Sequence, residues 1–99
     1  MANYILTIKA VGDLSNIWDY TFEVWSEAQA DKYYYMLLES LQEIAEGKVT
    51  GKKYAEIRND IFGFKIGQHI VFYRKLNLNT VEITRILHNR MDLKNRLEE

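Results

Sequence analysis

The fold is decided by residues 26–47, which read SEAQADKYYYMLLESLQEIAEG. The first four residues fit a capping box, in which the Ser26 hydroxyl accepts a hydrogen bond from the Gln29 amide and the Gln29 side chain returns to the Ser26 amide. Apolar residues then recur every three or four positions, and Gly47 stands where a left-handed C-terminal residue is favoured. The stretch therefore predicts a helix with one face that must pack against another element.

A second helix is predicted immediately upstream, with Asp13 as its N-cap. Its apolar stripe consists of Leu14, Ile17, Trp18, Thr21, Val24 and Trp25. Because almost nothing separates the two helices, they should form an antiparallel hairpin whose joint stripe packs on a flat element. Both tryptophans and the tyrosines at 33–35 are expected in the core, with Tyr35 the most exposed. Base stacking is the alternative role for the tyrosine run.

The flat element is predicted from short runs rich in β-branched and aromatic residues. These runs are residues 4–9 before the helices and residues 54–58, 63–66, 69–74 and 80–87 after them. Their short connections imply antiparallel neighbours. The predicted fold is α+β, in the order β-α-α-β-β-β-β, with the helical hairpin packed on a mainly antiparallel, twisted sheet. The other sheet face should stay partly open, and a short C-terminal helix capped by Asp92 should follow.

Strict alternation along the last strand sorts its side chains onto two faces. It puts Val81, Ile83, Arg85 and Leu87 on one face and Glu82, Thr84, Ile86 and His88 on the other. One interpretation of the charges is a ladder of cross-strand ion pairs, with Glu56 held by Arg58 or Arg85. The alternative is a basic concave face that binds phosphates or carboxylates through Arg58, Arg74, Arg85 and Arg90.

Length and composition limit the possible classes of protein. The 99 residues predict one domain over residues 1–99, and the absence of cysteine excludes disulfide scaffolds, thiolate metal sites and cysteine nucleophiles. No glycine loop for phosphate, paired-carboxylate site or metal-ligand cluster is visible, so neither a metal nor a cofactor is expected. No membrane span or leader is recognisable, which favours a cytoplasmic protein without membrane contact.

The charge is unevenly distributed along the chain. Residues 1–46 carry two lysines and eight acidic residues, a net charge of −6, whereas residues 47–99 carry eleven Lys or Arg and six acidic residues, a net charge of +5. The basic half can attract an anionic partner, either nucleic acid or an acidic protein segment. A solvated surface without a partner is the alternative.

The two histidines, His69 and His88, open and end predicted strands and should lie near the sheet margins. A surface or capping role is the commoner case for such residues. A general base that titrates near neutral pH is the alternative, and it suits His88 better because of the neighbouring Arg90.

The order of elements and several short motifs resemble the RelE/ParE superfamily of type II toxins, and specifically its ParE branch. The motifs are Asp13-Leu14, Ile17-Trp18, Trp25-Ser26, Gln29-Ala30, Glu56-Ile57-Arg58, His69-Ile70-Val71-Phe72-Tyr73 and Arg85-Ile86-Leu87-His88-Asn89-Arg90-Met91-Asp92. The resemblance spans residues 4–97, and the last motif is its most specific part.

The resemblance implies a bacterial growth inhibitor that is neutralised by a small antitoxin encoded beside it. ParE-like members poison DNA gyrase and are not enzymes, and they are not expected to bind nucleic acid sequence-specifically. The implied target-binding residues are Arg85, His88, Arg90, Met91 and Asp92. Asp92 could instead cap the final helix.

RelE-like members, in contrast, cleave mRNA on the ribosome. In that case the catalytic candidates are His88, Arg85, Arg58 and Arg74, with Lys52 and Lys53 nearby. The nuclease fits less well, because Asn89 stands where such enzymes carry a tyrosine and a pI near 6.1 is low for an RNA-binding protein. An inactive toxin-fold interaction module is the third possibility.

Overall fold

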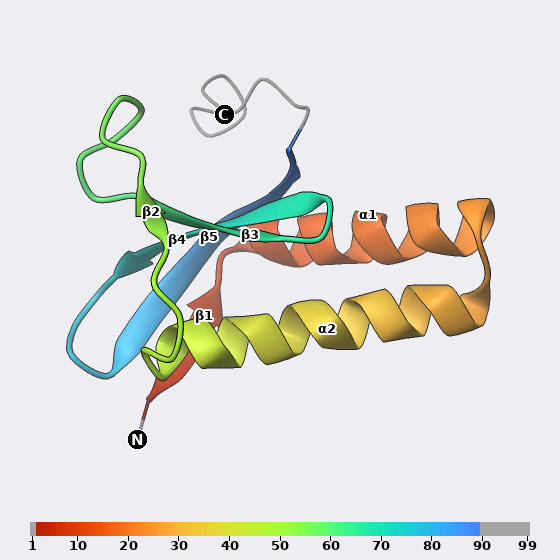
Figure 1. Ribbon diagram of the computed structural model, residues 1–99, viewed down its shortest axis with the longest axis horizontal. Coiled ribbons are helices and arrows are strands. Elements are labelled where there is room, and N and C mark those ends of the chain that lie inside the picture. Colours follow the sequence, from red (N-terminus) through yellow and green to blue (C-terminus); the bar gives the residue numbers. More distant parts are fainter. Residues whose placement is uncertain (1, 90–99) are drawn as a thin grey trace.

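The computed structural model describes residues 2–89 and consists of a helical hairpin on a five-stranded sheet. Its elements are β1 (Asn3–Leu6), α1 (Ile8–Val24), α2 (Glu27–Ala45), β2 (Lys52–Lys53), β3 (Phe62–Ile66), β4 (His69–Lys75) and β5 (Thr80–His88). The strand order is β1-β5-β4-β3-β2, with β1 parallel to β5 and all other neighbours antiparallel. The two helices run side by side along one face of the sheet (Figure 1). The predicted α+β fold is confirmed, whereas the predicted C-terminal helix lies outside the described residues.

The second helix follows its sequence signals closely. The Ser26 hydroxyl accepts a hydrogen bond from the Gln29 amide at 3.1 Å, and Gly47 adopts a φ of 74° just beyond the last turn. Leu37, Leu41 and other apolar side chains on one side of α2 are buried against the sheet. The helix is therefore defined at both ends by local interactions.

The first helix begins earlier than predicted, and the assignment of Asp13 as its N-cap is wrong. Thr7 is the N-cap, since its hydroxyl accepts a hydrogen bond from the Ala10 amide at 3.1 Å. The β-branched residues around Thr7 read as a continuing strand, but β1 ends at Leu6. Asp13 therefore lies inside α1, where its carboxylate is available for contacts with the sheet.

Residues 54–58 were expected to form a strand, and this prediction is also wrong. The amides of Ile57 and Arg58 both bond to the Tyr54 carbonyl, which closes tight turns. The loop covers the sheet face opposite the helices: Ile61 and Phe72 are buried there, and the Tyr54 ring meets Phe72 edge-on at 5.2 Å. That face is therefore partly covered by a second, smaller apolar cluster.

A β-bulge in β5 changes which side chains share a face. Phe72 pairs with Arg85 but Tyr73 pairs with Ile83, so Thr84 is the extra residue. After the bulge, Ile86 faces the helices with Ile83, whereas Leu87 faces the opposite cluster. The predicted strict alternation is therefore wrong beyond residue 83.

Two side chains of the α1 region take over the hydrogen bonding of β5 where β1 ends. The Thr7 hydroxyl donates to the Thr84 carbonyl at 2.7 Å, and the Asp13 carboxylate accepts from the Ile86 amide at 2.9 Å. These bonds satisfy strand-edge groups that would otherwise lack a protein partner. Helix α1 is thereby tied to β5 through hydrogen bonds as well as apolar packing.

The distal half of the hairpin projects beyond the sheet (Figure 1). Trp25 at the turn between the helices is 73% exposed, so the prediction that it belongs to the core is wrong. Tyr35 is 67% exposed, as predicted. The helical period indicated an apolar stripe correctly, but the sheet is too short to cover all of it. No helix within residues 2–89 is long and apolar enough to cross a bilayer.

Two glycines with positive φ provide a matched test of the turn between β3 and β4. A Cβ on Gly67 (φ 54°) would lie 2.8 Å from the Tyr33 hydroxyl oxygen, whereas a Cβ on Gly47 (φ 74°) would meet nothing within 4 Å. Gly47→Ala should cost about 1 kcal/mol from backbone strain alone. Gly67→Ala should cost about 1 kcal/mol more, because it also displaces a hydrogen-bonded hydroxyl. Chemical denaturation of both variants tests this order, and equal losses would contradict it.

Candidate binding surfaces

A basic cleft lies beside the start of α1, on the side of β5 that faces away from α2. Its volume is about 350 Å³, and it is lined by Thr7, Ile8, Lys9, Arg58, Ile61, Arg74, Glu82, Thr84 and Arg85. Three of the arginines predicted as candidate site residues therefore come together, although they are far apart in the sequence. The cleft has the shape and the cation content to receive an anionic group.

Each arginine of this cleft already has a carboxylate neighbour. Arg74 donates to Glu82 at 2.8 Å, which raises the pKa of its guanidinium, and it lies 3.6 Å from Asp60. Arg58 lies 3.5 Å from the same Asp60. The ladder of ion pairs therefore exists, but the predicted pairing of Glu56 with Arg58 or Arg85 is wrong.

Arg85 forms the most buried of these ion pairs. Its Nε donates to Asp13 Oδ2 at 2.8 Å and its Nη2 donates to Asp13 Oδ1 at 3.0 Å, a bidentate arrangement. The side chains of Arg85 and Asp13 are only 14% and 12% exposed. A guanidinium held in this way serves first to join α1 to β5.

His88 lies on the opposite side of the sheet from the cleft. It pairs across the strands with His69, and the two rings are 5.3 Å apart at an interplanar angle of 78°. Because of the bulge, Arg85 shares the face of the cleft, whereas His88 shares the face of Ile83 and Ile86. The predicted nuclease set is therefore divided, with three arginines in the cleft and His88 near α2. Arg90, Met91 and Asp92 lie outside the described residues.

His69 is half-buried and bonded to α2, which differs from the expected surface or capping role. Its Nδ1 lies 2.7 Å from the Tyr33 hydroxyl, which also accepts from the Gln68 amide at 3.1 Å. Burial, and secondarily the charge of His88, lowers the pKa of His69 to about 4. His69 is therefore neutral at physiological pH. Burial also raises the pKa of the Tyr33 hydroxyl.

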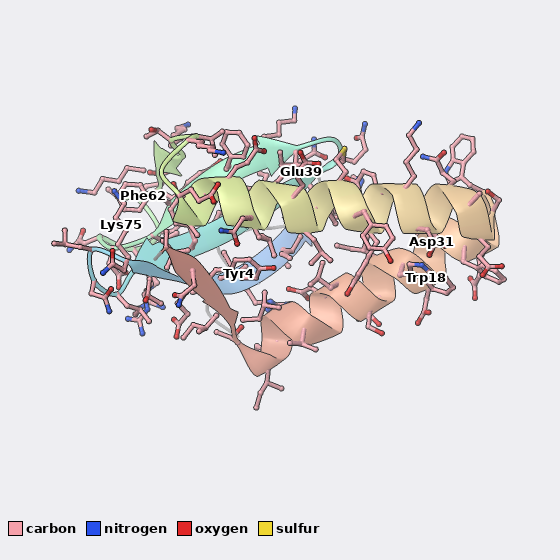
Figure 2. The ribbon with its side chains drawn as sticks, turned by 90° about the horizontal axis from the view of Figure 1, so that it is seen from below. Tyr4, Trp18, Asp31, Glu39, Phe62 and Lys75 are labelled. Atoms are coloured by element: carbon pink, nitrogen blue, oxygen red, sulfur yellow. The ribbon has the colours of Figure 1, made fainter. Side chains whose placement is uncertain are left out.

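An apolar groove of about 430 Å³ runs between the two helices on their outer side. Its lining consists of Leu6, Val11, Leu14, Ser15, Trp18, Asp19, Asp31, Tyr34 and Tyr35. The Trp18 indole donates to Asp31 at 2.9 Å, which links the helices across the groove (Figure 2). Val11 is 53% exposed and Tyr35 is 67% exposed, so the groove presents apolar surface to solvent with acidic groups in its wall.

This groove was only weakly indicated by sequence patterns. Trp18 and the tyrosines at 33–35 were interpreted as core residues, because periodicity identifies an apolar stripe but not how wide the covered part is. The excess of acidic residues in the first half was the available sign that the hairpin carries a charged outer surface. Within residues 2–89, no three His, Asp or Glu side chains gather into a group that could hold a metal ion.

Comparisons with known proteins agree with this architecture. Residues 4–93 match the family model described as ParE toxin of type II toxin-antitoxin system, parDE. Toxin ParE1 of Mycobacterium tuberculosis is 33% identical over 92 residues, which cover 93% of this chain and 94% of the relative. Toxin ParE1 of Caulobacter vibrioides is 35% identical over 92 residues, with the same coverage. Toxin ParE of Escherichia coli is 32% identical over 99 residues, which cover all of this chain and 96% of the relative.

A solved structure supports the fold independently. The structure titled "Chromosomal ParDE TA system from P. aeruginosa" superposes with a TM-score of 0.74 at 18% identity, covering 89% of this chain and 96% of that chain. The family model spans nearly the whole described chain and the curated relatives match over almost their full length. The chain therefore belongs to the ParE family of toxins from type II toxin–antitoxin systems.

Proposed function

We propose that this toxin is neutralised by a cognate antitoxin, one segment of which docks in the groove between α1 and α2. The observation that carries the proposal is the groove itself, an apolar hollow of about 430 Å³ between two helices that project beyond the sheet. Exposed apolar surface of this kind is typical of a site for a protein partner. An amphipathic helix with apolar residues on one face is the segment that suits such a groove.

The charges of the groove indicate the chemistry of the docking segment. Asp19 and Asp31 stand in its wall, and residues 1–46 carry a net charge of −6. A segment whose apolar residues are flanked by Lys or Arg would complement this surface. Acidic parts of the same antitoxin would suit the basic cleft beside β5 instead.

Tyr35→Ala should weaken antitoxin binding at least about tenfold, because the ring lines the groove and buried aromatic anchors dominate interface energies. Tyr20→Ala is the matched control: Tyr20 is 66% exposed, close to the 67% of Tyr35, but does not line the groove. Calorimetry with the antitoxin encoded beside the toxin gene measures both affinities. Equal affinities for the two variants would place the antitoxin elsewhere, and the absence of binding by the unaltered toxin would reject the antitoxin proposal itself.

We further propose that the toxin inhibits growth by poisoning DNA gyrase and acts as an inhibitor protein. Membership of the ParE family supports this proposal. The division of the nuclease candidates supports it as well, because His88 lies on the other side of the sheet from Arg58 and Arg74. Proton transfer needs the acid and base within hydrogen-bond reach of one reacting group.

Gyrase supercoiling and DNA cleavage by the purified toxin test this proposal, beside an mRNA cleavage assay on translating ribosomes. Loss of supercoiling with accumulation of cleaved DNA is the expected result. Codon-linked mRNA cuts would overturn it and favour the ribosomal endonuclease, for which the cleft with Arg58, Arg74 and Arg85 would be the site. The absence of both gyrase inhibition and mRNA cleavage would also overturn the proposal and would favour an inactive interaction module.

The gyrase contacts are proposed to involve the end of β5 and the residues that follow, namely Arg85, His88, Arg90, Met91 and Asp92. Arg85 has the structural partner Asp13, so its replacement would confound target binding with stability. Arg90→Ala and Asp92→Asn are the better variants. Each should reduce supercoiling inhibition while the melting temperature stays within a few degrees of the unaltered protein. Retained inhibition by both variants would move the contact surface away from the tail.

A further inference from the structure

His69 and His88 form a cross-strand pair whose arrangement no toxin function described above requires. They are direct partners in the register of β4 and β5, and both side chains lie on the face covered by α2. Directly opposite residues of antiparallel strands bring their Cβ atoms within about 5 Å of each other. The two imidazoles are therefore held together by the backbone of two adjacent central strands.

We propose that this pair binds a divalent zinc ion, with one ring nitrogen from each histidine as ligands. On a tetrahedral zinc with bonds of about 2.0 Å, and with about 1.1 Å from nitrogen to ring centroid, two imidazole centroids lie about 5.1 Å apart. The observed separation is 5.3 Å. The centroid spacing is thus compatible with a shared tetrahedral ion, and χ2 of His88 is a soft torsion through which its ring can turn toward that ion.

The surroundings of His69 are those of a metal ligand. A histidine that binds zinc through Nε2 keeps its proton on Nδ1 and donates it to an oxygen nearby. The Tyr33 hydroxyl oxygen lies 2.7 Å from Nδ1, and in the tautomer with the proton on Nδ1 it would accept that proton while its own hydrogen is donated to the Ile66 carbonyl at 3.3 Å. The Gln68 amide fixes the same oxygen at 3.1 Å. A hydrogen bond made by one ring nitrogen of His88 is compatible with metal binding, because the imidazole coordinates the ion through its other nitrogen.

Among residues 2–89, no third His, Asp or Glu side chain joins the two histidines in a group of metal ligands. Two histidines leave two positions of a tetrahedral ion for water.

The test is a zinc titration of the full chain without a histidine tag, followed by calorimetry. His69 and His88 are the only histidines and there is no cysteine, so imidazole binding reports on this pair alone. One ion per chain is expected, with a Kd that weakens about 100-fold or more in His69→Gln and His88→Gln, because each loses the second, intramolecular bond. Tyr33→Phe should retain the stoichiometry and weaken binding about 10- to 100-fold through the loss of the outer hydrogen bond.

Cobalt substitution supplies a readout of geometry, since visible absorption bands of tetrahedral Co²⁺ should appear in the unaltered chain and vanish in both histidine variants. Circular dichroism in the presence of a chelator verifies that each variant is folded. His88→Gln keeps the interpretation secure if His69→Gln fails to fold, because His69 is the residue bonded to α2. Zinc binding that is unchanged in His88→Gln would assign the ion to surface carboxylates and overturn the proposal. The absence of saturable binding by the unaltered chain would overturn it as well.

Discussion

Asp13→Ala should lower the free energy of unfolding by about 3 kcal/mol, the largest effect expected from a single polar substitution in this protein. The variant leaves the Arg85 guanidinium, only 14% exposed, without its bidentate partner. It also removes the acceptor of the Ile86 amide at the edge of β5. For a domain of this size such a loss corresponds to a fall in melting temperature of about 15 °C.

The control for Asp13→Ala is Glu23→Ala, which removes an exposed carboxylate from the same helix and should change stability by less than about 0.5 kcal/mol. The double variant Asp13→Asn with Arg85→Met should be less destabilised than the two single changes added together, because neither buried charge then lacks its partner. Thermal and chemical denaturation measure all of these. A loss below about 1 kcal/mol in Asp13→Ala would mean that the pair contributes no more than an exposed ion pair.

Stability should fall between pH 7 and pH 5 partly because of His69. Its pKa is about 4 in the folded protein against an ordinary value of 6.5, so the unfolded chain binds more protons in this range. The contribution of the neutral ring is complete above about pH 6.5 and is lost as the pH falls toward 4. After allowance for the partial exposure of the ring, the difference between pH 7 and pH 5 is about 1 kcal/mol.

His69→Asn isolates this contribution, because asparagine does not titrate and can still bond to the Tyr33 hydroxyl. Denaturation of both proteins at pH 7 and pH 5 should show a smaller pH dependence in the variant, by about 1 kcal/mol. Carboxylates contribute equally to the two proteins and cancel in the comparison. An identical pH dependence would show that His69 titrates near its ordinary pKa in the folded state.

The predictions for Asp13 and His69 concern two residues whose structural roles were predicted incorrectly from sequence patterns. Asp13 is of a residue type favoured at N-caps and precedes an apolar stripe, so local rules predicted that the helix begins there. The actual N-cap, Thr7, is a residue that also favours strands. What selected the longer helix is the unfinished edge of β5, where Thr84 and Ile86 require partners from the α1 region. No local pattern reports such a requirement.

The candidate surfaces were likewise predicted only in part from the sequence. The arginines of the cleft were identified as a group by their charge, but their carboxylate partners Asp13, Asp60 and Glu82 were not. His88 was grouped with them because of the resemblance to RelE-like nucleases and because of the neighbouring Arg90. A single inserted residue in β5 turns the strand over and brings His88 to His69 instead.

The sequence by itself determined the helical hairpin, the antiparallel pairs formed by β3, β4 and β5, and membership of a toxin family. The hairpin and the strand pairs depend on caps, periodicity and short turns, which are interactions between residues close in the chain, and the family follows from the sequence match over residues 4–93. Only the tertiary structure decided the start of α1, the bulge, the buried Asp13–Arg85 pair and the His69–His88 pair. Asp13 and Arg85 are 72 residues apart, and their contact forms only after the hairpin has packed on the sheet. The net energy of such a contact depends on its burial, which strengthens the attraction between the charges but also imposes a desolvation cost, and no window of neighbouring residues contains this information.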